Sequence, residues 1–181
     1  ETIMAKLAAL SVSRVAHYLS TKASNHFIFY QEATEYWVKA IVGLPFYSRN
    51  GKVGTPPHGR YLYLKDESTA IVICAILNSS LFYAYFVANS DCFHLSDTLV
   101  SRFPIPASVF QDKHLITLGM SLIKSLQQNA VTKTIRTKLG EEIAYAEFTG
   151  WRSKNEIDNI ENLLANHYGL TPQEVDHIKN Y

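Results

Sequence analysis

The chain has 181 residues, of which 47% are hydrophobic, 12% aromatic and 18% charged. This composition excludes a disordered segment and suits one domain with a sizeable core, with or without a helical appendage. The formal net charge is only +1, so nucleic-acid binding would require a local basic patch rather than bulk charge. Cys74 and Cys92 form no Cys-x-x-Cys pair, which excludes a disulfide framework, and the apolar surroundings of Cys74 indicate a buried reduced thiol.

The N-terminal residues lack the basic and long apolar regions of a secretory signal peptide. The chain begins at Glu1, with its first methionine at position 4, and ends abruptly at Tyr181. We therefore expect a fragment of a longer protein.

The first third of the chain predicts one helix followed by short strands. Apolar residues recur at helical spacing over 2–19, which predicts an amphipathic helix. Residues 27–30, 36–42 and 61–64 are rich in aromatic and β-branched side chains, which favour strands. Between them, residues 47–60 form a segment rich in glycine, proline and polar residues, which predicts a long loop.

Residues 69–88 are apolar enough, and long enough, for a membrane span. However, Asn78, Ser79 and Ser80 lie at the middle of this segment, and its flanks carry acidic residues instead of lysines. These features favour a buried core helix that is broken near Asn78.

The remainder of the chain predicts helices with one more strand. Ser96 is positioned to cap a short helix that ends before the prolines of 103–106. A longer helix follows over 113–131, and 143–148 predicts a short strand. Ser153 with Glu156 forms a capping-box pattern, Gly169 is placed to end that helix, and 171–174 begins a final one. The pattern as a whole predicts an α+β fold, with a small, mostly antiparallel sheet packed by an apolar helix and a helical C-terminal part.

Catalytic motifs are not found in this sequence. Residues 55–58 read Thr-Pro-Pro-His and lack both the amide or acid and the aromatic residue with which adenine methyltransferases hold a displaced base. Asp91, His94 and Asp97 share a three-residue spacing that could serve acid–base chemistry or a metal. No second pair of metal ligands at suitable spacing occurs elsewhere in the sequence. We therefore interpret Asp91 as a turn cap and His94 as half-buried against the core, and assign no catalytic or metal-binding residue.

Positive charge concentrates in one stretch of the chain. Residues 36–65 contain no acidic side chain, and tyrosines and a tryptophan are interleaved among the basic ones. Basic side chains bind the phosphates of DNA, and arginine or asparagine on a loop can reach base edges in a groove. The candidate DNA-binding residues are Lys39, Arg49, Asn50, Lys52, His58, Arg60 and Lys65. A weaker second cluster, diluted by glutamates, consists of Lys133, Arg136, Arg152 and Lys154, with Lys138 beside them.

Three stretches together resemble one protein family. The first is 36–40 with the turn 44–47. The second is Leu77-Asn78-Ser79-Ser80-Leu81-Phe82-Tyr83, followed by 90–95 and 103–106. The third is the C-terminal stretch from Phe148 to the end. In these stretches the chain is similar to the C-terminal target-recognition domain of bacterial N6-adenine DNA methyltransferases of restriction–modification systems, of the type II or IIG kind.

The resemblance implies that the chain binds double-stranded DNA sequence-specifically and presents a target adenine to a methyltransferase domain. That domain would lie upstream and bind S-adenosylmethionine, so no cofactor is expected in this fragment; the parent protein would be cytoplasmic. We divide the chain into a linking N-terminal helix over 1–24, a target-recognition core over 25–110 and a helical part over 111–181. Lys39, Lys52 and Lys65 are the expected phosphate contacts, whereas Arg49, Asn50 and Arg60 are the expected base readers.

Two alternatives from other classes remain open. The helix over 113–131 could dock a partner protein without any contact to DNA. An enzyme built on Asp91, His94 and Asp97 would instead show metal-dependent activity.

Overall fold

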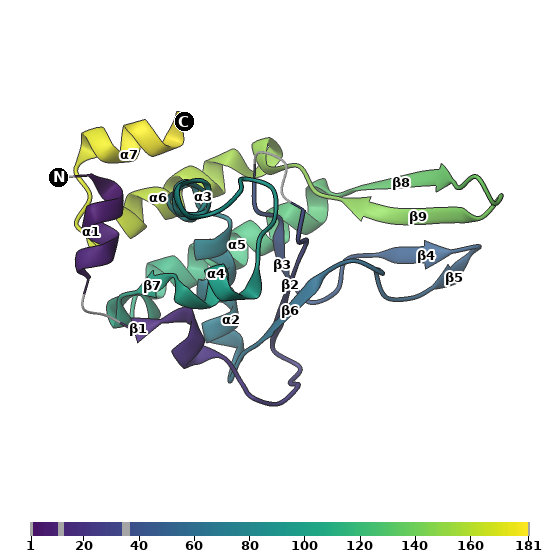
Figure 1. Cartoon of the computed structure of the whole chain (residues 1–181), viewed down its shortest axis with the longest axis horizontal. Helices are drawn as coiled ribbons and strands as arrows, with labels where there is room; N and C mark the ends of the chain where they lie inside the picture. Colours follow the sequence, from purple (N-terminus) through teal and green to yellow (C-terminus); the bar gives the residue numbers. More distant parts are fainter. Residues whose placement is uncertain (1, 11–12, 34–36, 181) are drawn as a thin grey trace.

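A computed structural model describes residues 2–10, 13–33 and 37–180 and confirms the α+β class (Figure 1). The helices are α1 (Ile3–Ala9), α2 (Glu67–Leu77), α3 (Ser80–Asn89), α4 (Asp97–Arg102), α5 (Lys113–Asn129), α6 (Lys154–Tyr168) and α7 (Pro172–Lys179), with short 3₁₀ turns η1 (Val15–Tyr18), η2 (Ala107–Phe110) and η3 (Gly150–Ser153). The strands are β1 (Ser13–Arg14), β2 (Phe27–Tyr30), β3 (Ala40–Val42), β4 (Tyr47–Arg49), β5 (Lys52–Val53), β6 (Arg60–Tyr63), β7 (Pro104–Ile105), β8 (Val131–Arg136) and β9 (Glu142–Glu147).

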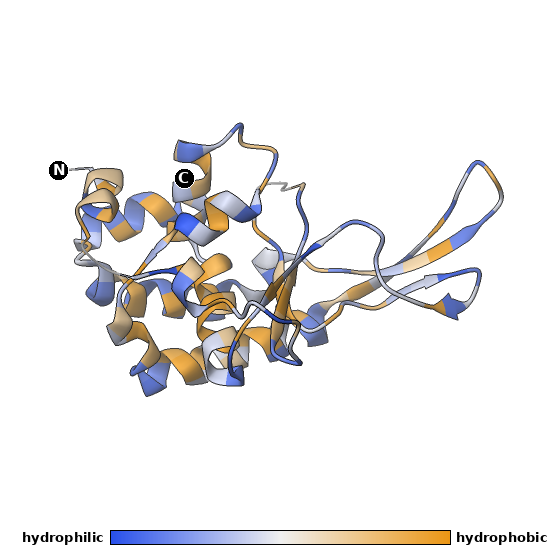
Figure 2. Cartoon of the chain, turned by 60° about the horizontal axis from the view of Figure 1, so that its bottom comes forward, coloured by the Kyte–Doolittle hydropathy of each residue, from blue (hydrophilic) through white to orange (hydrophobic). Residues whose placement is uncertain are grey.

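Helix α2 lies at the centre of the hydrophobic core. Asp66 caps its first turn by accepting a hydrogen bond from the Thr69 N–H at 2.8 Å, and every residue from Ala70 to Leu77 is buried. Helices α5 and α6 and strands β2 and β3 pack around it. A helix that is apolar on all sides is stable only when it is enclosed, which agrees with the concentration of hydrophobic residues in the helices and central sheet (Figure 2). The expected burial of Cys74 is confirmed, and that burial raises the pKa of the thiol to about 12.

The break predicted near Asn78 separates α2 from α3, which are bent by 65°. The Ser79 hydroxyl begins α3 by accepting a hydrogen bond from the Phe82 N–H at 3.1 Å. The Asn78 side chain is buried and bonded to backbone groups of Ala40 and Cys74. The amide is therefore satisfied within the core.

Within the described ranges, no single helix is long and apolar enough to cross a membrane, and only the bent α2–α3 pair passes that test jointly.

Strands β3, β2 and β6 form an antiparallel sheet in that order, with Phe29 opposite both Ile41 and Tyr61. A second, two-stranded sheet pairs β1 with β7. These sheets lie against the helices, and the β3-β2-β6 sheet separates the helical body from a projecting feature (Figure 1).

That feature, which we call the arm, comprises residues 47–53 and 131–147. The hairpins β4–β5 and β8–β9 join through β4 and β9 into a four-stranded antiparallel sheet. Asn50 and Gly51 link β4 to β5 with φ angles of 52° and 76°. Two successive residues with positive φ make the turn whose twist matches that of antiparallel strands, and asparagine followed by glycine adopts it readily.

Five local predictions were incomplete or wrong. The long loop predicted over 47–60 contains strands β4 and β5. Helix α1 ends at Ala9 instead of extending to residue 19, because Ser13–Arg14 pairs with β7. The strand predicted over 36–42 is described only as β3, and Tyr36 lies outside the described residues. Segment 131–136 was assigned no strand and forms β8, so part 111–181 is not wholly helical. Ser153 is at the N-cap position of α6, as predicted, but its hydroxyl makes no capping hydrogen bond and instead bonds that of Ser125 at 2.9 Å.

The remaining caps are confirmed. Ser96 accepts from the Leu99 N–H at 3.2 Å, Thr171 and Glu174 form a capping box, and Gly169 ends α6 with a φ of 63°. The three parts proposed from sequence share contacts: α5 packs on α2, β9 pairs with β4, and Lys6 of α1 lies 2.7 Å from Glu174 of α7.

Gly119 sets how closely α5 approaches α2. A Cβ atom at this position would lie 2.7 Å from Ile71 Cγ2 and 3.2 Å from the Ile71 carbonyl oxygen. Alanine is a better helix former than glycine, yet we expect Gly119→Ala to lower the free energy of unfolding by about 1–3 kcal/mol because of this overlap. Urea denaturation would measure it, with Ser121→Ala, an exposed position on the same helix, as the control. A Gly119→Ala protein as stable as the wild type would contradict this account of the packing.

Candidate nucleic-acid interface

The strand register of the arm collects aromatic and basic side chains on one face. Residues opposite one another in paired strands share a face, and alternate residues along a strand lie on opposite faces. Tyr145 is opposite both Tyr47 and Lys133, Ile143 is opposite Arg49, and Arg49 is opposite Lys52. We call this surface the basic–aromatic face; its tyrosines and cations are Tyr47, Arg49, Lys52, Lys133 and Tyr145.

The other face of the arm carries small or hydroxyl side chains over most of its area. Thr132 is opposite Ala146, and Thr134 and Ser48 are both opposite Ala144. Arg136 and Glu142 lie near the outer end, with 4.0 Å between Nη2 and Oε2. Arg136 is therefore separated by the sheet from the other cations of the arm.

Two of the predicted base readers hold the hairpins together. The Arg49 guanidinium lies 2.6 Å and 2.5 Å from the two carboxylate oxygens of Glu141. The Asn50 N–H donates to the Glu142 carbonyl at 2.7 Å, and its side-chain oxygen accepts from the Glu142 N–H at 2.8 Å. The side chain of Asn50 thereby continues the hydrogen-bond ladder between β4 and β9, and both residues have structural partners.

The lysines of the arm differ in their pairing. Lys133 Nζ lies 2.9 Å from Glu147 Oε2, and the hydrogen bond with this carboxylate raises the pKa of Lys133. Lys52 and Lys138 are exposed, and neither makes an ion pair with any residue that the structure describes. These two lysines are the most available charges for an external anion.

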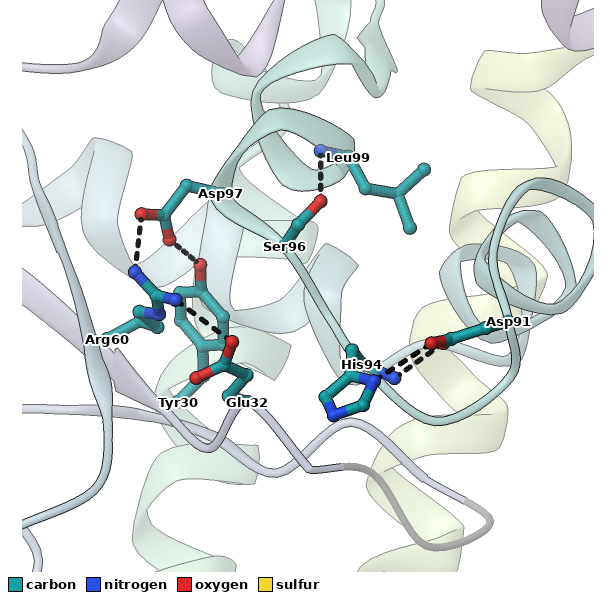
Figure 3. A network of polar contacts seen from close by, with 8 residues as sticks. All are labelled: Tyr30, Glu32, Arg60, Asp91, His94, Ser96, Asp97 and Leu99. Carbon is teal, nitrogen blue, oxygen red and sulfur yellow. Dashed lines mark hydrogen bonds and ion pairs between the residues drawn. The ribbon is translucent and has the colours of Figure 1, made fainter.

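Arg60 lies apart from the basic–aromatic face, in a polar network (Figure 3). Its guanidinium is 2.9 Å from Glu32 Oε1 and 3.4 Å from Asp97 Oδ2. The hydroxyl of Tyr30 donates a short hydrogen bond to the other oxygen of Asp97. Burial and this carboxylate raise the pKa of Tyr30, which keeps the phenol protonated as a donor. Arg60 therefore ties β6 to the segment after β2 and to the first residue of α4.

Asp91, His94 and Asp97 do not converge. His94 Nδ1 is 2.8 Å from Asp91, whereas Asp97 points to Tyr30 and Arg60 (Figure 3). Asp91 also accepts from the N–H groups of Phe93 and His94, and hydrogen bonds from His94 and Phe93 hold its pKa far below the ordinary value. No group of three potential metal ligands occurs among residues 2–10, 13–33 and 37–180. Asp91 serves as a turn cap, as the sequence interpretation had it, whereas the expected half-burial of His94 is wrong, because its side chain is exposed.

Two adjoining pockets open at the base of the arm. The outer pocket, of about 460 Å³, is lined by Phe29, Lys39, Phe93 and Tyr145 among others. The tryptophan pocket, of about 590 Å³, is lined by Trp37, Lys39, Trp151 and Lys154 among others. Lys39, Glu147 and Phe148 line both pockets, so the basic–aromatic face continues through Tyr145 into this hollowed region.

The other predicted cations are dispersed. His58 and Lys65 are exposed on either side of β6. Arg152 lies over the Trp151 ring, with 5.3 Å between its Cζ and the ring centroid, and Lys154 pairs with Asp158 at 2.8 Å. The sequence analysis missed Tyr145, Phe148 and Trp151. The alternation of Thr and larger residues over 131–136, typical of a strand, was the signal that could have placed β8 beside them.

Helix α5, on which the docking alternative depends, directs Leu115, Leu122 and Leu126 into the core against α2 and α6. Its apolar stripe is therefore covered by the chain itself. Comparisons of the chain with models of protein families, with curated proteins and with solved structures find no match.

Proposed function

We propose that this chain is the target-recognition part of a bacterial N6-adenine DNA methyltransferase of a restriction–modification system, and that its arm binds double-stranded DNA. In this proposal the arm positions a target adenine for a methyltransferase domain that lies upstream and binds S-adenosylmethionine. The parent enzyme would act in the cytoplasm. The observation that carries the proposal is the basic–aromatic face, where Arg49 and Lys52 of the first sequence cluster meet Lys133 of the second.

The dimensions of the arm support this role. Each long strand of the β8–β9 hairpin has six residues, which corresponds to about 20 Å of extended chain. The major groove of B-DNA, about 12 Å wide, admits a two-stranded ribbon of this kind. Lys52 and Lys138 lie toward the free end of the arm, where phosphates flanking a groove would be reached, and Lys133 and the tyrosines follow toward its base.

The pairing of Arg49 with Glu141 refines the roles expected from the sequence. A guanidinium that is bound bidentately must release a carboxylate before it can contact a base edge in the same geometry. We therefore assign the first phosphate contacts to Lys52 and Lys138, which make no ion pair among the described residues, and regard Arg49 and Asn50 as residues that hold the arm in shape. Arg60, already bound to Glu32 and Asp97, stabilises the body.

The test is duplex DNA binding measured by fluorescence anisotropy across a salt series. Each phosphate contact contributes about −0.9 to the slope of log affinity against log salt concentration. Lys52/Lys138→Ala is therefore expected to make the slope less negative by about 1.8 and to weaken binding at every salt concentration.

Lys22/Lys113→Ala is the matched control, because it removes the same charge from exposed positions outside the arm. At 1.5 Å per residue, Lys113 lies about 24 Å from Asn129, beyond which the arm begins. The control is expected to bind as the wild type does. Equal effects of the two variants would indicate unspecific charge attraction, and the absence of duplex binding at low salt would refute the proposal for this chain. Selection from a random duplex pool would then test sequence specificity.

A further inference from the structure

The tryptophan pocket combines aromatic walls with a basic rim. It lies where the end of β9, η3 and the start of α6 meet Trp37 and the start of α3. Its aromatic residues are Trp37, Tyr83, Phe148 and Trp151, and its volume of about 590 Å³ is within the range of small-ligand sites. The chain contains only two tryptophans, and both line this pocket.

The two indoles are held differently. Trp37 is partly buried, and its Nε1 donates to the Asn78 carbonyl at 3.1 Å. A Cβ atom on Gly150 would lie 2.9 Å from the Trp37 ring, so the backbone of η3 packs directly on one side of that indole. Trp151 is 72% exposed and stands at the rim. The Trp37 wall is thus preorganised, whereas the Trp151 wall is exposed, with Arg152 over its ring at 5.3 Å.

Positive charge surrounds the opening. Lys154 and Lys179 are bonded to Asp158 and Asn162, each at 2.8 Å, and the lining carboxylate Glu147 is neutralised by Lys133. Lys39 makes no ion pair with any described residue. Flat aromatic surfaces beside cations are what a nucleotide requires, because the base stacks on the rings and the phosphate is attracted to the lysines.

We propose that the tryptophan pocket takes up one unpaired nucleotide of a DNA strand, with its base against the indoles and its phosphate beside Lys39. This inference rests on the proposed function, because DNA that follows the basic–aromatic face reaches the pocket through Tyr145, Lys39 and Phe148. It adds a preference for a nucleotide that has left the base-pair stack.

The first experiment titrates the protein with deoxyadenosine monophosphate and follows tryptophan emission, excited at the red edge of the indole band. Because both tryptophans line the pocket, stacking of a base is expected to quench or shift most of the emission. Inorganic phosphate alone is expected to leave it unchanged. Trp151→Phe should retain most of the affinity, whereas Trp151→Ala and Lys39→Gln should each weaken it. Circular dichroism would establish that these variants remain folded.

The second experiment compares a blunt duplex with the same duplex carrying one unpaired nucleotide at its end. One stacked base should tighten binding by at least about fivefold. Trp151→Ala is expected to abolish this difference while leaving the salt slope for the blunt duplex unchanged.

The outcomes separate the two proposals. Quenching together with a lost overhang preference in Trp151→Ala would support the pocket assignment. If the overhang gives no advantage, the assignment to a DNA strand is overturned, and quenching by the mononucleotide would then identify a free nucleotide as the ligand. If neither probe acts, the pocket binds no nucleotide. If single strands bind with quenching but the blunt duplex does not, the arm proposal fails and the pocket assignment stands.

Discussion

Raising the pH from about 5 to about 8 is expected to lower the free energy of unfolding by about 2–3 kcal/mol through one carboxyl group, Glu161. This residue is 1% exposed, and burial raises its pKa from the ordinary value of 4.5 to about 7. One carboxyl oxygen accepts a hydrogen bond from the Ser80 N–H at the start of α3, and the other has no partner among the described residues. A buried and incompletely bonded carboxylate is costly, so the folded protein retains the proton.

The sign follows from the two pKa values. Between about pH 4.5 and 7, the folded state holds a proton that the unfolded state releases, so stability decreases as the pH rises and levels off above the folded-state pKa. For a chain of this size, a loss of 2–3 kcal/mol corresponds to a decrease in Tm of about 4–12 °C.

Urea denaturation of wild type and Glu161→Gln at several pH values would measure this effect. Glutamine stays neutral and can still accept the bond from Ser80, so this variant should lack the contribution of Glu161 to the pH dependence. Glu174→Gln is the matched control: the hydrogen bond with Lys6 lowers the pKa of Glu174, so this carboxyl contributes no loss of stability as the pH rises. A Glu161→Gln protein that retains the full wild-type dependence would show that other groups cause it.

Asn78→Ala is expected to lower the free energy of unfolding by about 2–4 kcal/mol. The Asn78 amide donates to the carbonyls of Ala40 at 2.8 Å and Cys74 at 2.9 Å, and its oxygen accepts from the Ala40 N–H at 3.2 Å. Strand β3 is at the edge of its sheet, so Asn78 supplies the partner that a further strand would provide. Alanine would leave the Ala40 N–H buried without a partner and its carbonyl with only the weak bond from the Cys74 thiol at 3.5 Å, which costs more than the lost bonds themselves contribute.

Thermal unfolding would test this, with an expected decrease in Tm of about 4–16 °C. Asn89→Ala is the matched control, since Asn89 is exposed at the end of α3. Its amide donates to the Tyr85 carbonyl one turn earlier and makes a weak contact with the Met4 sulfur at 4.0 Å. It should change Tm far less. Similar decreases for the two variants would mean that the amide of Asn78 is not what joins α2 to β3.

The features that the sequence predicted correctly depend on neighbouring residues. An Asn-Ser-Ser break in an apolar helix, the caps at Ser96 and Thr171 and the terminating Gly169 each act within a few positions, so local patterns identify them. The same reasoning failed at Ser153. Its hydroxyl bonds Ser125, which is on another helix and carries no local signal.

Much of the candidate site was decided by tertiary structure. The arm exists because β4 pairs with β9 across more than 90 positions, and that pairing places Arg49 beside Glu141 and Lys133 on the same face as Arg49. Likewise, Arg60 is bound by Asp97, and the two tryptophans, far apart in the chain, line one pocket. The sequence by itself determined the α+β class, the buried helix and its break, because hydrophobic pattern and capping are local. The partners of the charges depend on which distant strands and helices meet, and no local pattern records that.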